Sequence, residues 1–313
     1  MSLTKQRIYY IDALKALAIV SIVMIHVPQH IQFDGDFWGK LAGIFAVPLF
    51  FTLSGMMSNV EDYKIKKRLK VLVPFLFFGI TCTLCYGKSL TSFLLTMDKN
   101  GYWFLWVIIV YSISIFVIHK THINKHLGFA LFGILYVALY TIFPRAFRYL
   151  FSINLIILYW PFVYVGILLR NNKIIDVCKK YYKAILMLLV CNVIIYVNIK
   201  TLGAISMLFQ QLLALMIIMS LIIGFSKLYG KASANNRIQK YISSVGQETL
   251  QIYVLHYFFF LPFDSAIFKQ MTGGHSSTAE LFINPFLSVI ITMLCYLFAK
   301  TIYNVHLGFL FGR

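Results

Sequence analysis

Two ionisable residues stand at the ends of an apolar stretch close to the N-terminus. Residues 15–26 read KALAIVSIVMIH, with Lys15 and His26 separated by ten apolar or small residues. In an α-helix, eleven steps of about 100° bring both side chains to one face, about 16 Å apart. An ammonium binds anionic groups and a neutral imidazole acts as a general base, so this spacing predicts a long ligand.

A purely structural interpretation of the same stripe stays open. Asp12 and Lys15 have the i,i+3 spacing of an ion pair at the headgroup level, and His26 would then cap the far end of a span. His256, in IYVLHYFFF, is about ten residues into another apolar segment, near the middle of a bilayer. An ionisable residue at that depth is either functional or satisfied by a neighbouring helix.

A cluster of cations precedes Pro74 in the run KIKKRLKVLVP. Its members are Lys64, Lys66, Lys67, Arg68 and Lys70. A helix through this run would place Lys67 and Lys70 on one face, where they would suit phosphate groups. The other interpretation is an orienting anchor that also touches anionic lipid heads.

Composition shows what kind of protein positions these residues. Of 313 residues, 60% are hydrophobic, 17% aromatic and only 12% charged, and the mean hydropathy is +0.80. These values exclude a water-soluble domain and predict an all-α integral membrane protein. Ten apolar segments have the length of a membrane span. They cover residues 9–28, 40–59, 70–87, 101–119, 127–143, 153–170, 183–200, 204–226, 247–264 and 281–304.

Charge then orients this predicted bundle of about ten transmembrane helices. The net charge is +18, and most Lys and Arg residues fall in the loops that are cytoplasmic when the N-terminus is inside. An even number of spans places the C-terminus in the cytoplasm as well. The positive charge therefore indicates membrane orientation and a lipid bilayer as partner, and no nucleic acid is expected.

The chain has no internal repeat and no linker, so residues 1–313 are interpreted as a single membrane-embedded domain. Cys82 and Cys85 form a C-T-L-C pair, but no second pair of ligands completes a zinc site. We therefore predict no metal.

Five short motifs in order resemble the membrane acyltransferase type 3 family, the bacterial O-acyltransferases of surface polysaccharides and related glycans. They are Lys15 with ten residues to His26, FFTLSG at 50–55, Lys67 and Lys70 before Pro74, YWFL at 102–105, and IYVLH at 252–256. The resemblance covers nearly the whole chain. The family has arginine where this chain has Lys15, Lys67 and Lys70, so the charge is kept and the planar two-bond fork is lost.

The resemblance implies an activity and a set of site residues. His26 matches the family's essential histidine, with Lys15 as the second catalytic position. Acyl-CoA, most commonly acetyl-CoA, would dock its phosphates against Lys67, Arg68 and Lys70 at the cytoplasmic mouth. Its thioester would then reach His26, where a hydroxyl of a carbohydrate acceptor is activated.

Supporting positions implied by the same motifs are Ser54, Trp103 and His256, with Ser54 and Gly55 expected to allow close helix packing. The implied location is the bacterial cytoplasmic (inner) membrane.

Two other functions fit the residues without the resemblance. A transporter or flippase for a lipid-linked saccharide or small anion would also need ten spans, intramembrane histidines and an aromatic interior. A non-catalytic assembly protein of a polysaccharide machine would bind no CoA. Consumption of acyl-CoA in the presence of a glycan distinguishes the enzyme from both.

Overall fold

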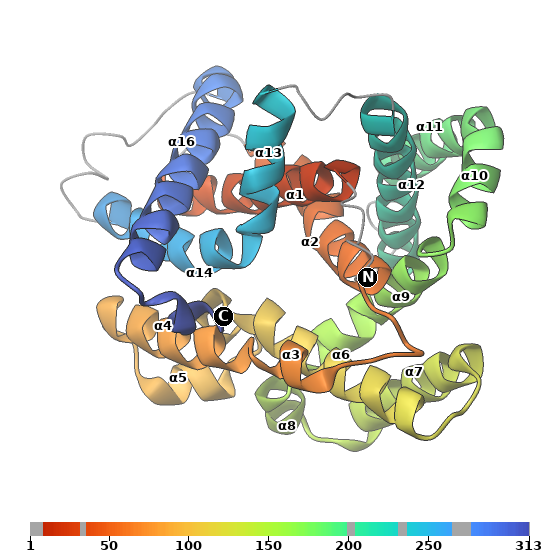
Figure 1. Cartoon of the computed structure of the whole chain (residues 1–313), viewed down its shortest axis with the longest axis horizontal. Coiled ribbons are helices and arrows are strands. Elements are labelled where there is room, and N and C mark those ends of the chain that lie inside the picture. Colours follow the sequence, from red (N-terminus) through yellow and green to blue (C-terminus); the bar gives the residue numbers. More distant parts are fainter. Residues whose placement is uncertain (1–8, 32–35, 199–203, 231–236, 265–276, 313) are drawn as a thin grey trace, which may run out of the picture.

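The computed structural model describes residues 9–31, 36–198, 204–230, 237–264 and 277–312, and these residues form helices and turns with no strand. Figure 1 shows how the helices are arranged. The longer ones are α1 (Tyr9–His30), α2 (Phe37–Met56), α4 (Leu72–Cys85), α6 (Trp103–Lys120), α7 (Lys125–Ile142), α9 (Ile153–Leu169), α11 (Tyr182–Asn198), α12 (Ala204–Gly230), α13 (Arg237–Gln247), α14 (Thr249–Phe260) and α16 (Ser277–Asn304). The shorter ones are α3 (Ile65–Leu69), α5 (Leu90–Leu95), η1 (Lys99–Gly101), α8 (Arg145–Leu150), α10 (Asn172–Lys180), η2 (Leu261–Asp264) and η3 (Gly308–Phe311).

Seven helices within the described residues are long and apolar enough to cross a membrane, which confirms the predicted all-α membrane fold. Each of the ten predicted segments contains a helix, but those near 153–170, 183–200 and 247–264 are too short by themselves. The first of these gives an eighth crossing if α9 and α10, bent by 99°, are one broken span. Ten crossings and two cytoplasmic termini stay predictions.

Helix α1 lies inside the bundle rather than at its edge. It packs against α2, α12, α13, α14 and α16, and Figure 1 shows it crossing the middle of the molecule. Its apolar window is 56% buried, whereas that of α7 is 17% buried. Because protein surrounds α1, its polar side chains face other helices and cavities rather than lipid.

Helix α13 lies in the stretch between two of the spans predicted from the sequence, and it packs closely against α1. Gly246 of α13 crosses α1 so closely that a Cβ there would lie 1.8 Å from the Asp12 carbonyl oxygen. Ser243 Oγ donates to Asp12 Oδ2 over 3.0 Å, and Asp12 Oδ1 is 3.9 Å from Lys15 Nζ. The i,i+3 pair expected from the sequence is therefore present, and it is held by a third residue from α13.

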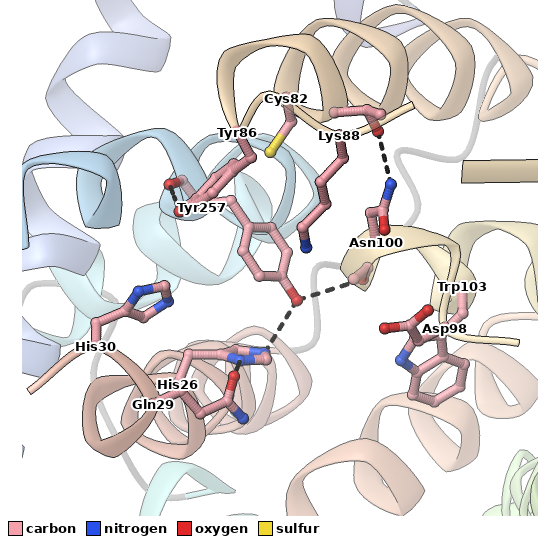
Figure 2. A pocket seen from close by; sticks show the side chains of 12 residues that line it. His26, Gln29, His30, Cys82, Tyr86, Lys88, Asp98, Asn100, Trp103 and Tyr257 are labelled. Atoms are coloured by element: carbon pink, nitrogen blue, oxygen red, sulfur yellow. Dashed lines mark hydrogen bonds between the residues drawn. The ribbon is translucent and has the colours of Figure 1, made fainter. Parts of the chain in front are cut away.

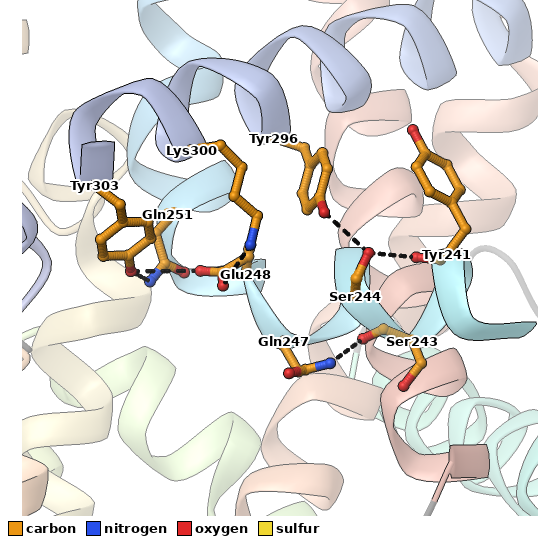
Figure 3. A network of polar contacts seen from close by, with 9 residues as sticks. All are labelled: Tyr241, Ser243, Ser244, Gln247, Glu248, Gln251, Tyr296, Lys300 and Tyr303. Carbon is orange, nitrogen blue, oxygen red and sulfur yellow. Dashed lines mark hydrogen bonds and ion pairs between the residues drawn. The ribbon is translucent and has the colours of Figure 1, made fainter. Parts of the chain in front are cut away.

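A polar network fixes the turn from α13 into α14 (Figure 3). Glu248 stands at this turn and is only 5% exposed. From α16, Lys300 Nζ lies 3.6 Å from Glu248 Oε1, and the Tyr303 hydroxyl donates to Glu248 Oε2 over 3.4 Å. Gln251 of α14 donates to the same Tyr303 hydroxyl. Since a buried carboxylate needs such partners, these bonds set the direction in which α14 leaves the turn.

Two glycines bring α2 and α9 together. A Cβ on Gly55 would lie 2.2 Å from the Val163 carbonyl oxygen, and one on Gly166 would lie 2.0 Å from the Thr52 carbonyl oxygen. The obstacles are backbone atoms of the facing helix, so side chains cannot relieve the overlap. Small residues at such crossings are the usual means of close helix packing in membranes.

The start of α2 is capped from a distant helix, which gives a prediction about stability. Asp36, the N-cap residue, makes no capping bond with its side chain. Instead the buried carboxylate of Glu280 in α16 accepts from the backbone N–H groups of Phe37 and Trp38, at 3.2 and 3.3 Å. Glu280→Ala should leave these donors unpaired and lower the free energy of unfolding by about 1–3 kcal/mol. Thermal unfolding of the solubilised protein measures this.

The matched control is Glu61→Ala. That carboxylate is 83% exposed and lies 3.9 Å from Lys125 Nζ, and exposed pairs contribute little. Equal midpoints for the two variants would show that the Glu280 cap does not stabilise the bundle.

Candidate active site

His26 opens into a cavity of about 320 Å³ between α1, α4, η1 and α14 (Figure 2). This space is called the histidine cavity here. Its lining residues are His26, Gln29, His30, Cys82, Thr83, Tyr86, Lys88, Asp98, Asn100, Gly101, Trp103 and Tyr257. Aromatic rings and polar groups of both charges thus surround one imidazole.

Both ring nitrogens of His26 have partners. Nδ1 lies 3.0 Å from Gln29 Oε1, and Nε2 lies 3.1 Å from the Tyr257 hydroxyl. Since an amide oxygen only accepts, the proton belongs on Nδ1 with Gln29 in this orientation. Nε2 then carries a lone pair that accepts from Tyr257, which is the state that a general base requires.

His256 lies behind this cavity rather than in its lining. It is fully buried, with its ring centroid 5.2 Å from that of His26 and 4.0 Å from that of Tyr257. Its Nδ1 lies 2.6 Å from the Tyr253 carbonyl oxygen. Its Nε2 has no hydrogen-bond partner among the described residues. From this position the His256 ring packs against the rings of His26 and Tyr257.

The loop that carries Asn100 and Gly101 forms one rigid wall of the histidine cavity. The buried Lys99 Nζ donates to the carbonyl oxygens of Leu94 and Leu150, at 2.5 and 2.7 Å. It thereby caps the C-terminal ends of α5 and α8. Burial lowers the pKa of Lys99 to about 8, and the neighbouring Asp98 opposes this shift. Asn100 Nδ2 donates to Thr83 Oγ1 over 3.0 Å.

Gly101 is required at the end of this loop. Its φ is +95°, and a Cβ there would lie 2.3 Å from the Tyr257 hydroxyl oxygen. Both its backbone conformation and the space beside Tyr257 therefore depend on the missing side chain.

A second cavity of about 270 Å³ is lined by three of the other predicted cations, Lys15, Lys67 and Arg68, and is called the cationic cavity. Its lining residues are Lys15, Phe50, Leu53, Ser54, Met57, Lys67, Arg68, Val71, Phe104, Leu105, Ile108, Thr249, Leu250 and Tyr253. Three positive charges thus stand at the rim of a mostly apolar space.

The structure distinguishes the members of the basic run. Lys67 and Arg68 line the cationic cavity, and Arg68 also donates to the Met57 carbonyl oxygen over 2.9 Å. Lys70, the C-cap residue of α3, is not among the residues that line this cavity. Ser54 lines the same cavity, as does Lys15, whereas His26 and Trp103 line the histidine cavity.

One layer of side chains separates the two cavities. Tyr253 faces the cationic cavity and Tyr257, one turn later in α14, faces the histidine cavity. Both hydroxyls reach the Gly101 carbonyl oxygen, at 2.6 and 3.4 Å. Trp103 and Phe104 likewise lie on opposite sides. Lys15 and His26 therefore line separate cavities rather than the continuous passage expected, and the partition between them includes the hydrogen bond from Tyr253 to Gly101.

Sequence reasoning missed several residues of the site. Tyr253 and Tyr257 are at i and i+4 with His256 between them, and this spacing also occurs in any aromatic packing face. Asn100 and Gly101 form an N-G pair that signals a turn. No sequence signal showed that this turn would supply the carbonyl that both tyrosines share.

Comparison with known proteins identifies one matching family. A family model described as an acyltransferase domain matches residues 8–300, almost the entire chain. No curated protein and no solved structure gives a significant match. Among the described residues, no group of three or more His, Cys, Asp or Glu side chains is arranged to hold a metal ion. The matched range includes both cavities and the partition, and the chain belongs to the acyltransferase type 3 family of membrane acyltransferases.

Proposed function

We propose that this protein is an O-acyltransferase of a bacterial cytoplasmic membrane, and that the group it transfers is acetyl. It moves the acyl group of cytoplasmic acyl-CoA to a hydroxyl of a cell-surface glycan or lipid-linked sugar. The observation that supports this most is the pair of cavities, one cationic and one containing a histidine base, on either side of a single tyrosine layer. Two substrates of different chemistry can reach such a layer from separate directions.

The cationic cavity suits the acyl donor. Lys67 and Arg68 at its rim would bind the phosphates of CoA, and Lys15 would meet an oxygen further along the molecule. The apolar lining suits the pantetheine arm. Delivery of the thioester requires the Tyr253 side chain to turn away from Gly101, because its hydroxyl closes the end of this cavity.

The histidine cavity suits a carbohydrate. Trp103 and Tyr86 offer ring faces, and Asp98, Asn100 and Gln29 offer polar groups around the base. His26 Nε2 would take the proton of a sugar hydroxyl while the oxygen attacks the thioester carbonyl carbon. The departing CoA sulfur then receives that proton from the imidazolium, which returns His26 to its neutral form.

The experiment is complementation of a gene deletion in the native host. Mass spectrometry of surface glycans should show an acyl ester that is lost on deletion and restored by the wild-type gene. Membrane vesicles from the same cells, given acetyl-CoA labelled in the acetyl group, should transfer the label to glycan and release CoA. A saccharide that crosses the membrane without CoA release would show a transporter or flippase instead.

Lys67→Gln should raise the KM for acetyl-CoA in these vesicles by about tenfold, with kcat nearly unchanged. One phosphate contact of roughly 1.4 kcal/mol would be lost in both ground and transition states. Initial rates over a range of acetyl-CoA concentrations measure this.

Lys66→Gln is the control, since this exposed lysine precedes Lys67 and does not line the cationic cavity. Equal KM values for the two variants would mean that the basic run serves only to orient the protein in the membrane.

A further inference from the structure

We propose that Tyr257 is a further catalytic residue beside His26: its hydroxyl donates a hydrogen bond to the oxyanion that forms when the acceptor oxygen attacks the thioester. This rests on the proposed function and adds a hydrogen-bond donor to the base in the histidine cavity.

The position of the Tyr257 hydroxyl is tightly fixed. The residue is 8% exposed, and its ring lies against Tyr102 and His256, with centroids at 5.5 and 4.0 Å. The hydroxyl of Tyr86 donates to the backbone carbonyl of Tyr257 over 2.9 Å. Only a glycine at position 101 leaves room for the phenol oxygen. A hydroxyl whose ring is held in this way is preorganised, as an oxyanion donor must be.

The bonds of this hydroxyl allow it to change partner during the reaction. It has one proton and two acceptors within reach, His26 Nε2 at 3.1 Å and the Gly101 carbonyl oxygen at 3.4 Å. When a sugar hydroxyl donates to Nε2, that acceptor is taken and the phenol proton is released. A developing oxyanion is then a better acceptor than the distant Gly101 carbonyl, because charged acceptors form the stronger bonds.

The distances are compatible with this role. The attacked carbon is bound to the oxygen that His26 deprotonates, so the oxyanion forms within about 5 Å of Nε2. An oxyanion donor should lie about 3 Å from that oxygen. The Tyr257 hydroxyl, 3.1 Å from Nε2 and in the cavity lining, is within reach of an oxygen at that distance from the base.

Other donors in the cavity are less well placed. The Asn100 amide already donates to Thr83 Oγ1 and Ser92 Oγ, at 3.0 and 3.2 Å. Lys88 is exposed, although Figure 2 shows its ammonium pointing into the cavity. Tyr257 is the donor that contacts the base itself.

The proposed step is balanced in protons and electrons. The acceptor O–H bond breaks toward His26 Nε2 as the new C–O bond forms, and the C=O electron pair moves onto the oxygen that Tyr257 stabilises. Collapse of this intermediate restores C=O, breaks the C–S bond and sends the proton of His26 to the CoA sulfur. Tyr257 keeps its own proton throughout.

The test compares Tyr257→Phe with wild type in vesicles of the complemented deletion strain, with labelled acetyl-CoA as donor and the endogenous glycan as acceptor. Loss of one oxyanion donor should lower kcat by about 10²- to 10³-fold and leave the KM for acetyl-CoA within about threefold. The pH at which activity is half lost on the acidic side should stay within about half a unit of wild type. A large shift there would show that Tyr257 only positions His26 and would overturn the proposal.

Tyr136→Phe is the matched control, since it also removes a buried tyrosine hydroxyl. Its partner Ser114 keeps a bond to the Val110 carbonyl oxygen at 3.0 Å, and neither Tyr136 nor Ser114 lines either cavity. This variant should keep wild-type kcat.

Three outcomes contradict different statements. If wild-type vesicles transfer no label, the proposed function itself is wrong. If wild type transfers label and Tyr257→Phe stays within threefold in kcat, only the role of Tyr257 is wrong. If Tyr257→Phe and Tyr136→Phe lose activity equally, the loss comes from a missing buried hydroxyl in general, and the role of Tyr257 is again wrong.

Discussion

His26→Ala should reduce acyl transfer by about 10³-fold or more while the protein still accumulates in the membrane. The change removes the group that accepts the proton of the acceptor hydroxyl, and such a base contributes about 10²- to 10⁴-fold. Tyr257 keeps the Gly101 carbonyl as an alternative acceptor at 3.4 Å, so little else is left unpaired. Transfer of labelled acetyl groups to glycan, normalised to protein amount, measures the effect.

His119→Ala is the control for this experiment. It also removes an imidazole, in the last turn of α6 and outside the lining of both cavities. It should retain wild-type activity. Substantial transfer by His26→Ala would remove His26 from the chemistry and leave only a packing role for the residue.

Gly166→Ala should prevent stable folding, although it adds a single methyl group. The new Cβ would lie 2.0 Å from the Thr52 carbonyl oxygen and 2.9 Å from Gly55 Cα, so α2 and α9 must separate. Overpacking of this kind costs about 1–3 kcal/mol, and more where backbone rather than side chains must move. We expect little folded protein by size-exclusion chromatography, and a midpoint of thermal unfolding at least 10 °C lower in what remains.

Gly224→Ala is the matched control, because this glycine is also inside a helix but a Cβ there meets no atom within 4 Å. Alanine favours helix over glycine by about 1 kcal/mol, so this variant should be as stable as wild type or more so. If Gly166→Ala behaves in the same way, the close crossing of α2 and α9 is not needed for folding.

The helical segments were predictable because a long run of apolar residues is a strong signal of a membrane-spanning helix. The segment 9–28 became α1, and 101–119 became α6, within two residues at each end. The signal fails where a segment changes direction. The apolar run 247–264 contains the twelve-residue α14, whose start is set by a carboxylate, Glu248, and its partners on α16. Such distant partners leave no local pattern.

Part of the candidate site was predictable for the same reason. The helical spacing from Lys15 to His26 could be predicted, because both residues lie on the one helix α1. The spacing from Lys67 to Lys70 did not show that only the first of them lines the cationic cavity, and the role of both in donor binding stays a prediction. Tyr257 and Gly101 are far apart in sequence, and their contact depends on a turn with positive φ that sequence patterns do not specify.

The tyrosine layer between the cavities also bears on leakage through the bundle. Two hollows on opposite sides of a shared wall would form a channel for ions if the wall opened widely. Tyr253 and Tyr257 bond to the same carbonyl, so one can swing aside while the other stays. Acyl transfer through this layer, as proposed above, would need only one of the two side chains to move, so the bundle need not open a path for ions.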